Sequence, residues 1–212
     1  MIQTIVFDFG GVIATIDGNE AKKRFTDLGV ADIDHVLDPY RQQGIFGDLE
    51  EGKLSEEGYR KELGKMCGRE LNFDEVKYCW LGYMKELPAY KLEALLKLRR
   101  EGYRVVMLSN TNPYVMHWAE SKEFSGDGHS VDFYFDAMYR SYEVGCMKPD
   151  ENFFRHVLAK ERILPSETLF VDDGPRNVAA ASELGMTTYC PANGADWTKE
   201  IYKYLDVKLD EE

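Results

Sequence analysis

The chain has 212 residues, of which 44% are hydrophobic and 13% aromatic, and its formal net charge at pH 7 is −12. This length accommodates a core domain with a smaller inserted domain, and the apolar content excludes a disordered chain. The negative charge repels phosphate backbones and anionic lipid surfaces, so we expect neither nucleic acid nor a membrane as a partner. An anionic substrate therefore has to be captured by local cations, a metal ion or backbone N–H groups.

The N-terminus and the cysteines indicate a cytoplasmic protein. The chain starts with a strand-like run that carries no basic leader. No apolar stretch approaches the roughly 18 residues that a membrane-spanning helix needs. The cysteines form neither CxxC pairs nor a disulfide framework, and they stand at Cys67, Cys79, Cys146 and Cys190. We expect free thiols in a reducing compartment.

Short apolar runs end abruptly at small or acidic residues. They span residues 2–7, 103–108, 168–171 and 187–190, with weaker strand material at 133–139. Such continuous runs suit strands buried on both faces of a parallel sheet, and helical patterns lie between the later runs, starting near Pro88 and ending before Gly102 and Gly185. We therefore predict a doubly wound, mostly parallel, Rossmann-like α/β fold, in which the carboxyl ends of the strands share one edge.

Residues 16–86 interrupt this alternation. The segment is too long for one crossover and has helical patterning without convincing strands, as in "NEAKKRFTDLG" and "FDEVKYCWLGYMKEL". We predict an all-helical domain over residues 16–86, inserted into a core formed by residues 1–15 and 87–212.

Chemically capable side chains follow the predicted strands in a fixed order. Asp8 follows the first strand, Ser109 the next, Lys148 precedes a helix, and Asp172 and Asp173 follow a later strand. Adjacent carboxylates repel each other, and a metal ion is the usual reason to tolerate that. Together these residues supply a carboxylate nucleophile, a divalent cation site, phosphate ligands and an ammonium group, which is a complete set for phosphoryl transfer.

Four segments in this order resemble the motifs of the haloacid dehalogenase superfamily, over nearly the whole chain. They are "FDFGGVI", "VVMLSNTN", "GCMKPD" and "LFVDDGPRNVAAASELGM". The helical insertion resembles the C1 cap of subfamily I, which lies between the first two motifs. The opening together with "LSNTN" and "KPD" is most similar to small sugar-phosphate phosphatases, including those that act on glucose 1-phosphate.

The resemblance implies a role for each matched residue. Asp8 attacks phosphorus and becomes an aspartyl phosphate. Mg²⁺ is held by Asp8, the backbone carbonyl of Gly10 and Asp173, with Asp172 behind them or bound through water.

It also implies how the substrate is held. Ser109 and the backbones of Gly11 and Asn110 bind phosphate oxygens, and Lys148 neutralises the approach of two anions. Asn177 orients metal-bound waters or Lys148, or is simply a polar residue in the first turn of a helix. The expected ligands are thus Mg²⁺ and a small phosphorylated metabolite.

Gly10 stands where phosphatases of this superfamily carry the aspartate that protonates the leaving alcohol. Loss of general acid–base catalysis typically costs about 10²–10⁴ in rate. Three outcomes follow: weak or absent activity, replacement by another carboxylate, or a substrate that needs little acid assistance, such as a sugar 1-phosphate. Asp17 is the nearest replacement in sequence, although a turn residue is an equal interpretation.

The absent aspartate leaves two alternatives to a phosphatase. Dehalogenases of the same superfamily also lack it, but they need no metal, whereas the Asp172–Asp173 pair indicates one. A catalytically weak protein that binds a metabolite or a protein partner is the second. "DFG" also occurs in protein kinases, but no Gly-rich loop or catalytic "HRD" accompanies it here.

Substrate choice is expected to depend on the insertion. Arg41, Gln42 and Gln43 could bind sugar hydroxyls, and Phe46 could contact an apolar ring face, if the cap closes over the phosphate site.

Overall fold

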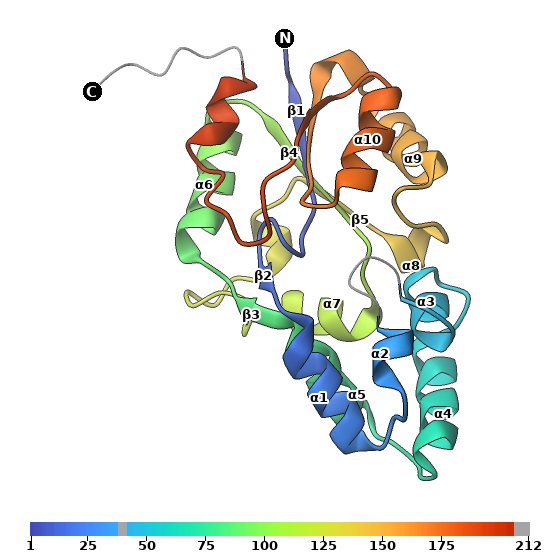
Figure 1. Ribbon diagram of the computed structural model, residues 1–212. Helices are drawn as coiled ribbons and strands as arrows, with labels where there is room; N and C mark the ends of the chain where they lie inside the picture. The colour runs from blue at the N-terminus through green and yellow to red at the C-terminus, as the bar shows by residue number, and fades with distance from the viewer. Residues whose placement is uncertain (38–41, 206–212) are drawn as a thin grey trace.

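The computed structural model describes residues 1–37 and 42–205, which form a sheet-containing half and a helical half (Figure 1). The strands of the first half are β1 (Thr4–Phe7), β4 (Arg104–Ser109), β5 (Ala137–Arg140), β6 (Thr168–Val171) and β7 (Thr187–Tyr189). Its helices are α6 (Ala89–Arg100), α7 (Pro113–Ala119), α8 (Ser141–Val144), α9 (Glu151–Glu161) and α10 (Pro175–Glu183), with 3-10 turns at Val131–Phe133, Pro165–Glu167 and Glu200–Lys203.

The five strands form one sheet in the order β5-β4-β1-β6-β7, and every pairing is parallel. The central strand β1 aligns Ile5 with Val105 of β4 on one side and with Leu169 of β6 on the other. The order reverses at β1, because the chain first builds outward to β5 and then returns to add β6 and β7. The doubly wound, Rossmann-like α/β fold predicted from the sequence is confirmed.

The central strands β1, β4 and β6 are buried on both faces, which explains why they are almost continuously apolar. Ile5 and Phe7 pack on the face covered by α6, whose inner side chains are Leu92, Leu95 and Leu98. Val6 and Phe170 pack on the opposite face with Phe153, Phe154 and Val157 of α9 and Ala181 of α10. Figure 1 shows α6 on one side of the sheet and the α9–α10 pair on the other.

The helical half lies beyond the carboxyl ends of the strands (Figure 1). It contains α1 (Gly18–Leu28), α2 (Ile33–Val36), α3 (Ile45–Glu50), α4 (Glu56–Cys67), α5 (Phe73–Trp80) and a 3-10 turn at Leu81–Tyr83. Sequence signals define the helix starts: Ser55 caps α4, and Asn72 and Glu75 form a capping box on α5.

An aromatic cluster forms the core of this half. Phe25, Phe46, Tyr59 and Trp80 are nearly or fully buried, and their ring centroids lie 5.1–6.1 Å apart. Phe46 makes edge-on contacts with Phe25 and Tyr59. The prediction that Phe46 contacts a substrate was wrong, because its ring is the centre of a hydrophobic core rather than part of an open surface.

Two short strands connect the halves. β2 (Thr15–Ile16) and β3 (Met84–Glu86) pair antiparallel, with Ile16 opposite Met84. The sequence predicted no strand here, because runs of two and three residues are too short to show a period of two. The chain thus leaves the sheet half and returns to it through one two-stranded connection.

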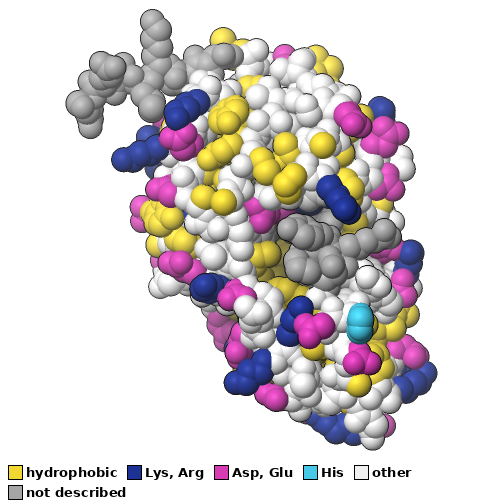
Figure 2. Space-filling view, viewed as in Figure 1, with side chains coloured by type: hydrophobic (Ala, Val, Ile, Leu, Met, Phe, Trp, Pro, Cys, Tyr) yellow, Lys and Arg dark blue, Asp and Glu magenta, His cyan; other side chains and the backbone are white. Residues whose placement is uncertain are grey.

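The surface carries charges of both signs. Among the described residues, no helix is long and apolar enough to cross a membrane. On the face shown in Figure 2, Lys and Arg side chains are mixed with Asp and Glu around the helical half. Ion pairs between neighbouring helix turns contribute to this mixture, as between Lys61 and Glu57 on α4. Such exposed pairs contribute little stability.

Candidate active site

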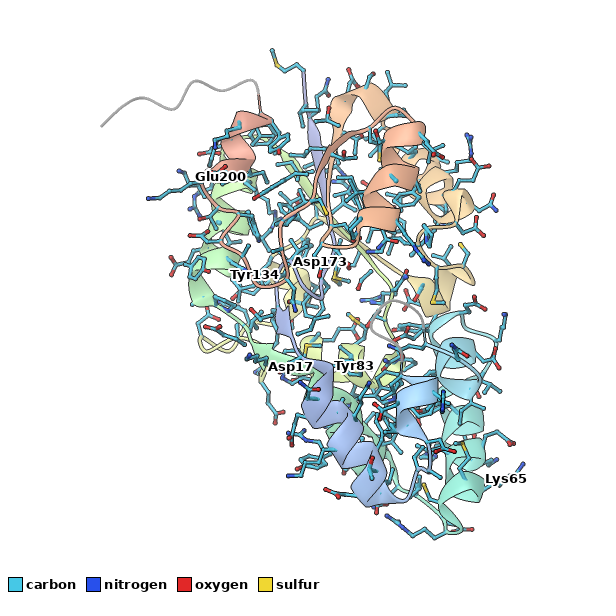
Figure 3. The ribbon with its side chains drawn as sticks, viewed as in Figure 1. Asp17, Lys65, Tyr83, Tyr134, Asp173 and Glu200 are labelled. Atoms are coloured by element: carbon cyan, nitrogen blue, oxygen red, sulfur yellow. The ribbon has the colours of Figure 1, made fainter. Side chains whose placement is uncertain are left out.

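The site is built at the carboxyl ends of three neighbouring strands. Asp8 follows β1, Ser109 ends β4, and Asp172 and Asp173 follow β6. Since β1 lies between β4 and β6, these side chains meet at the edge of the sheet that faces the helical half. Figure 3 shows Asp173 at this edge.

Lys148 lies at the centre of the site, with a fully buried side chain. Its ammonium nitrogen Nζ is 2.9 Å from Asp8 Oδ1 and 2.7 Å from Asp172 Oδ2. It also donates to the carbonyl oxygen of Leu108 at 2.8 Å. Burial disfavours the charged form of Lys148, but Asp172 and Asp8 outweigh burial and raise its pKa above the usual value. Lys148 is therefore a fixed positive charge beside Asp8.

Asp172 is completely buried and is held from several directions. Its Oδ1 accepts from the backbone N–H of Gly174 at 2.7 Å, and Asn177 Nδ2 lies 3.0 and 3.1 Å from its two oxygens. Lys148 completes the set at 2.7 Å. Asn177 therefore orients Asp172. From the sequence, we had expected its partner to be a metal-bound water or Lys148.

Asp8, Asp172 and Asp173 could hold a metal ion together. Each offers a carboxylate oxygen, and these oxygens lie within 4.8 Å of one another. Three carboxylates and one lysine leave an excess of negative charge, which a divalent cation would balance. Oxygen ligands from carboxylates are those that hard cations prefer.

Two of the acidic groups, Asp8 and Asp173, have raised pKa values. Burial raises the pKa of Asp8 well above its usual value; Lys148 lowers it, and Asp172 and Asp173 raise it. Burial, followed by the charge of Asp172, raises the pKa of Asp173 to about 6. A divalent ion bound here would favour the ionised form of both groups.

Gly11 makes space for Asp173. It has φ of +80°, and a Cβ atom added there would lie 2.2 Å from the Asp173 carboxylate. The Gly11 N–H donates to the carbonyl of Ala14 at 2.8 Å. Because N–H and C=O of a trans peptide point in opposite directions, the Gly10 carbonyl is directed away from Ala14.

Gly10 itself leaves a small space next to Ile16. A Cβ atom at position 10 would lie 3.5 Å from Ile16 Cγ2 and 3.7 Å from Ile16 Cδ1, which are ordinary contacts. The backbone of Gly10 is not in the left-handed region. Neither the backbone conformation nor the space for a Cβ atom therefore requires glycine at this position.

The loop after β4 is tied to Lys148. Asn110 Oδ1 accepts from the Lys148 backbone N–H at 2.8 Å, and Asn110 Nδ2 donates to the Lys148 carbonyl at 2.9 Å. Ser109 is almost completely buried, and its hydroxyl is 3.4 Å from the Asn110 carbonyl. The side chain of Asn110 thus positions the lysine, a role that no local sequence signal indicated because the partners are 38 residues apart.

The remaining predicted residues lie on the connection and in the helical half. Asp17 caps α1, with Oδ1 accepting from the Asn19 N–H at 3.0 Å, and it lies at the start of that helix (Figure 3). Gln42 Nε2 is 3.5 Å from the hydroxyl of Tyr83. Arg41 lies outside the described residues.

Sequence reasoning missed a link between the halves at Glu50. This residue ends α3, and its half-buried carboxyl group lies beside Asn112, the residue that caps α7 in the sheet half. Burial raises the pKa of Glu50 to about 7, although the polar side chain of Asn112 lowers it. Two residues further on, Gly52 approaches the carbonyl of Tyr142 so closely that a Cβ atom would lie 2.2 Å from it. The turn after α3 is thus packed against α8.

Comparisons with known proteins agree with this geometry. The family model described as haloacid dehalogenase-like (HAD-like) hydrolase matches residues 2–185. D-ribitol-5-phosphate phosphatase of Bacteroides thetaiotaomicron is 51% identical over 206 residues, covering 97% of this chain and 100% of the relative.

Two solved structures share the whole fold. A predicted HAD-like family hydrolase from Porphyromonas gingivalis has a TM-score of 0.93 and 44% identity, covering 98% of this chain and 100% of its own. A HAD family enzyme from Bacteroides thetaiotaomicron, in complex with magnesium and inorganic phosphate, has a TM-score of 0.86 and 33% identity, covering 94% and 99%.

Proposed function

Since the chain belongs to the haloacid dehalogenase-like hydrolase family, we propose that it is a Mg²⁺-dependent phosphatase of a small phosphorylated metabolite. The observation that carries the proposal is the joint placement of Asp8, Asp172 and Asp173 around the buried Lys148. The substrate class we favour is the phosphate of a sugar or sugar alcohol, supported by the relative that acts on D-ribitol 5-phosphate.

Asp8 is the proposed nucleophile. Its carboxylate attacks phosphorus, the P–O bond to the alcohol breaks, and an aspartyl phosphate forms that water then hydrolyses. Lys148, 2.9 Å from Asp8, offsets the repulsion between this carboxylate and the incoming phosphate.

The metal ligands we propose are Asp8, Asp173 and the backbone carbonyl of Gly10. Asp172 is proposed not to bind the metal directly, or to bind it through water, because its oxygens already accept hydrogen bonds from Lys148, Gly174 and Asn177. When bound, Mg²⁺ would neutralise phosphate oxygens and lower the pKa of the carboxyl groups that hold it.

The phosphate would be held by the loops that follow β1 and β4. Ser109 and the backbone N–H groups of Gly11 and Asn110 are the proposed ligands, and the position of Ser109 at the end of β4 supports this. Oxygen atoms of a transferring phosphate need several fixed donors because charge is spread over all of them.

Residues 16–86 are the proposed cap domain, with residues 1–15 and 87–212 as the core. The placement of α1–α5 beyond the carboxyl ends of the strands, and the β2–β3 connection, support this division. The cap would cover the substrate, exclude water and supply residues that recognise its hydroxyl groups. Arg41 is a proposed contact for these hydroxyls.

The general acid is the open part of the mechanism, since Gly10 cannot supply it. Asp17 is the proposed replacement, located where the connection enters the helical half. A leaving group that departs without full protonation, such as the anomeric oxygen of a sugar 1-phosphate, would reduce this need.

A dehalogenase and a non-catalytic binding protein are the competing functions. A dehalogenase does not use a metal, so it would give no reason for three clustered carboxylates. A binding protein would have no use for a carboxylate held against a buried lysine in the position of a nucleophile.

The test is release of inorganic phosphate from a panel that includes D-ribitol 5-phosphate, ribose 5-phosphate and glucose 1-phosphate, with Mg²⁺ or EDTA. We expect Mg²⁺-dependent release by the wild type and loss of at least about 10³ in kcat for Asp8→Asn, because the amide is not a nucleophile. Phosphate release that survives in Asp8→Asn would refute the aspartyl-phosphate mechanism. Halide release from a 2-haloacid, with no phosphate release, would favour the dehalogenase.

A further inference from the structure

The segment that follows β7 contacts the chain just after the nucleophile. The side-chain amide of Asn193 forms two hydrogen bonds to the backbone of Ile16. The Ile16 N–H donates to Asn193 Oδ1 at 3.1 Å, and Asn193 Nδ2 donates to the Ile16 carbonyl at 2.8 Å. An amide side chain offers a donor and an acceptor together, so it can pair with a peptide as a neighbouring strand would.

Neighbouring residues extend this contact toward Asp8. The N–H of Gly194 donates to the carbonyl of Gly11 at 2.8 Å. The carbonyl of Val12 accepts from the indole N–H of Trp197 at 3.0 Å and from Nζ of the buried Lys91 at 2.8 Å. Gly11 is three residues beyond the nucleophile, so residues 193–197 hold the first motif from its outer side.

The approach is close enough to be specific. A Cβ atom added to Gly194 would lie 2.8 Å from Thr15 Cγ2, so a side chain there would push the two segments apart. Thr15 and Ile16 form β2, whose other edge pairs with β3. Asn193 therefore takes the place of a third strand on the connection between the two halves.

The side chain of Ile16 also lies beside Gly10, two residues after Asp8. This side chain lies 3.5 Å from the position that a Cβ of residue 10 would occupy, and the next residue is Asp17. Any shift of Ile16 would move both the apolar surface beside Gly10 and the start of α1. The backbone of Ile16 thus couples the placement of the helical half to the geometry around Asp8.

We propose that Asn193 is a positioning residue for the hydrolysis. Its amide fixes the β2–β3 connection and thereby the position of the helical half relative to the acidic cluster. The proposal rests on the phosphatase function and adds to it a residue outside the four motifs. We expect its effect on binding of the organic part of the substrate, because under the proposed function that part would lie between the halves, whereas the sheet half would hold the phosphate group.

The experiment compares two substrates that differ in how much they use the helical half. Asn193→Ala removes both bonds, and Asn193→Asp keeps the acceptor for the Ile16 N–H. D-ribitol 5-phosphate presents a polyol to the helical half, whereas p-nitrophenyl phosphate offers it no hydroxyl chain. Asn72→Ala is the control, because it removes a helix cap in the helical half, at a cost of about 1 kcal/mol, without touching the connection.

We expect Asn193→Ala to raise KM for D-ribitol 5-phosphate at least about fivefold and to leave KM for p-nitrophenyl phosphate within about twofold, with Asn193→Asp in between. Hydrogen exchange of the backbone amides in residues 11–17 and 84–86 should become faster in Asn193→Ala and stay unchanged in Asn72→Ala.

Equal changes of KM for both substrates would overturn the proposal, since they would indicate a general loss of structure. Unchanged exchange at residues 11–17 would also overturn it. If the wild type hydrolyses neither substrate, the phosphatase function fails, and the exchange measurement alone then decides whether Asn193 fixes the connection.

Discussion

At the scale of single residues, the site is defined by charges that lie unusually close together. Lys148 is within 3 Å of two carboxylates, and Asp173 lies beside both. Each of these residues would be costly to bury alone. A bound divalent cation would explain why they lie together, because it would balance the excess negative charge of three carboxylates beside one lysine.

Position 10 gives the sharpest test at this scale. We predict that Gly10→Asp raises kcat for D-ribitol 5-phosphate by about tenfold or more, because an added carboxyl group can protonate the leaving alkoxide. A Cβ atom at this position makes ordinary contacts with Ile16, so the substitution introduces no clash at Cβ. Phosphate-release kinetics would measure the change.

Gly10→Asn is the matched control, with the same shape and no acid, and it should not increase the rate. p-Nitrophenyl phosphate should respond little to either variant, because its phenolate leaves without a proton. An equal gain for Asn and Asp would contradict the acid–base interpretation and point to an effect of packing.

At the scale of elements, the helical half is held together by close backbone contacts as well as by its aromatic core. Gly82, in the turn after α5, lies against α1: an added Cβ atom would be 2.6 Å from the Cα of Ala21. Backbone atoms cannot move aside as the end of a flexible side chain can. The distance between α1 and this turn is therefore set by the absence of a side chain.

We predict that Gly82→Ala lowers the free energy of unfolding by about 1–3 kcal/mol, because the added methyl group forces α1 and the turn apart. Urea denaturation would measure it. Gly126→Ala is the control, since no atom lies within 4 Å of a Cβ placed there, and its stability should stay within about 0.5 kcal/mol of wild type. Equal stability of the two variants would show that α1 and the turn can separate at no cost.

At the scale of the whole molecule, the two halves meet at a titratable contact. Glu50 of α3 lies beside Asn112 of the sheet half, and burial raises its pKa to about 7. The hydroxyl groups of Tyr59 and Tyr114 belong to the same buried region. A carboxyl group with a raised pKa binds its proton more tightly in the folded protein than in the unfolded chain.

The pH dependence follows from that difference. Between about pH 4.5 and pH 7 the folded protein holds the Glu50 proton and the unfolded chain does not, so this contribution to stability is lost as pH rises. We predict that Glu50→Gln removes this dependence: relative to wild type, the variant should gain about 2–3 kcal/mol between pH 5 and pH 8. Urea denaturation at several pH values measures this.

Glu57→Gln, on an exposed face of α4, serves as the control and should show no such gain. A parallel dependence of wild type and Glu50→Gln on pH would show that Glu50 is ionised in the folded protein throughout this range.

The sequence by itself determined the sheet and the residues at its edge. Four apolar runs predicted β1, β4, β6 and β7, and a weaker pattern indicated β5, because the central strands of a parallel sheet covered on both faces are buried on both sides. The residues that follow those runs were predicted to meet, because the carboxyl ends of parallel strands share one edge of the sheet. These residues are Asp8, Ser109, Asp172 and Asp173.

The tertiary structure decided the contacts between residues far apart in the chain. The link from Asn193 to Ile16 spans 177 residues, and that from Asn110 to Lys148 spans 38. The burial of Phe46 and the contact of Glu50 with Asn112 are of the same kind. Hydrophobic periodicity reports which side of its own element a residue occupies, whereas partners on other elements depend on how those elements pack.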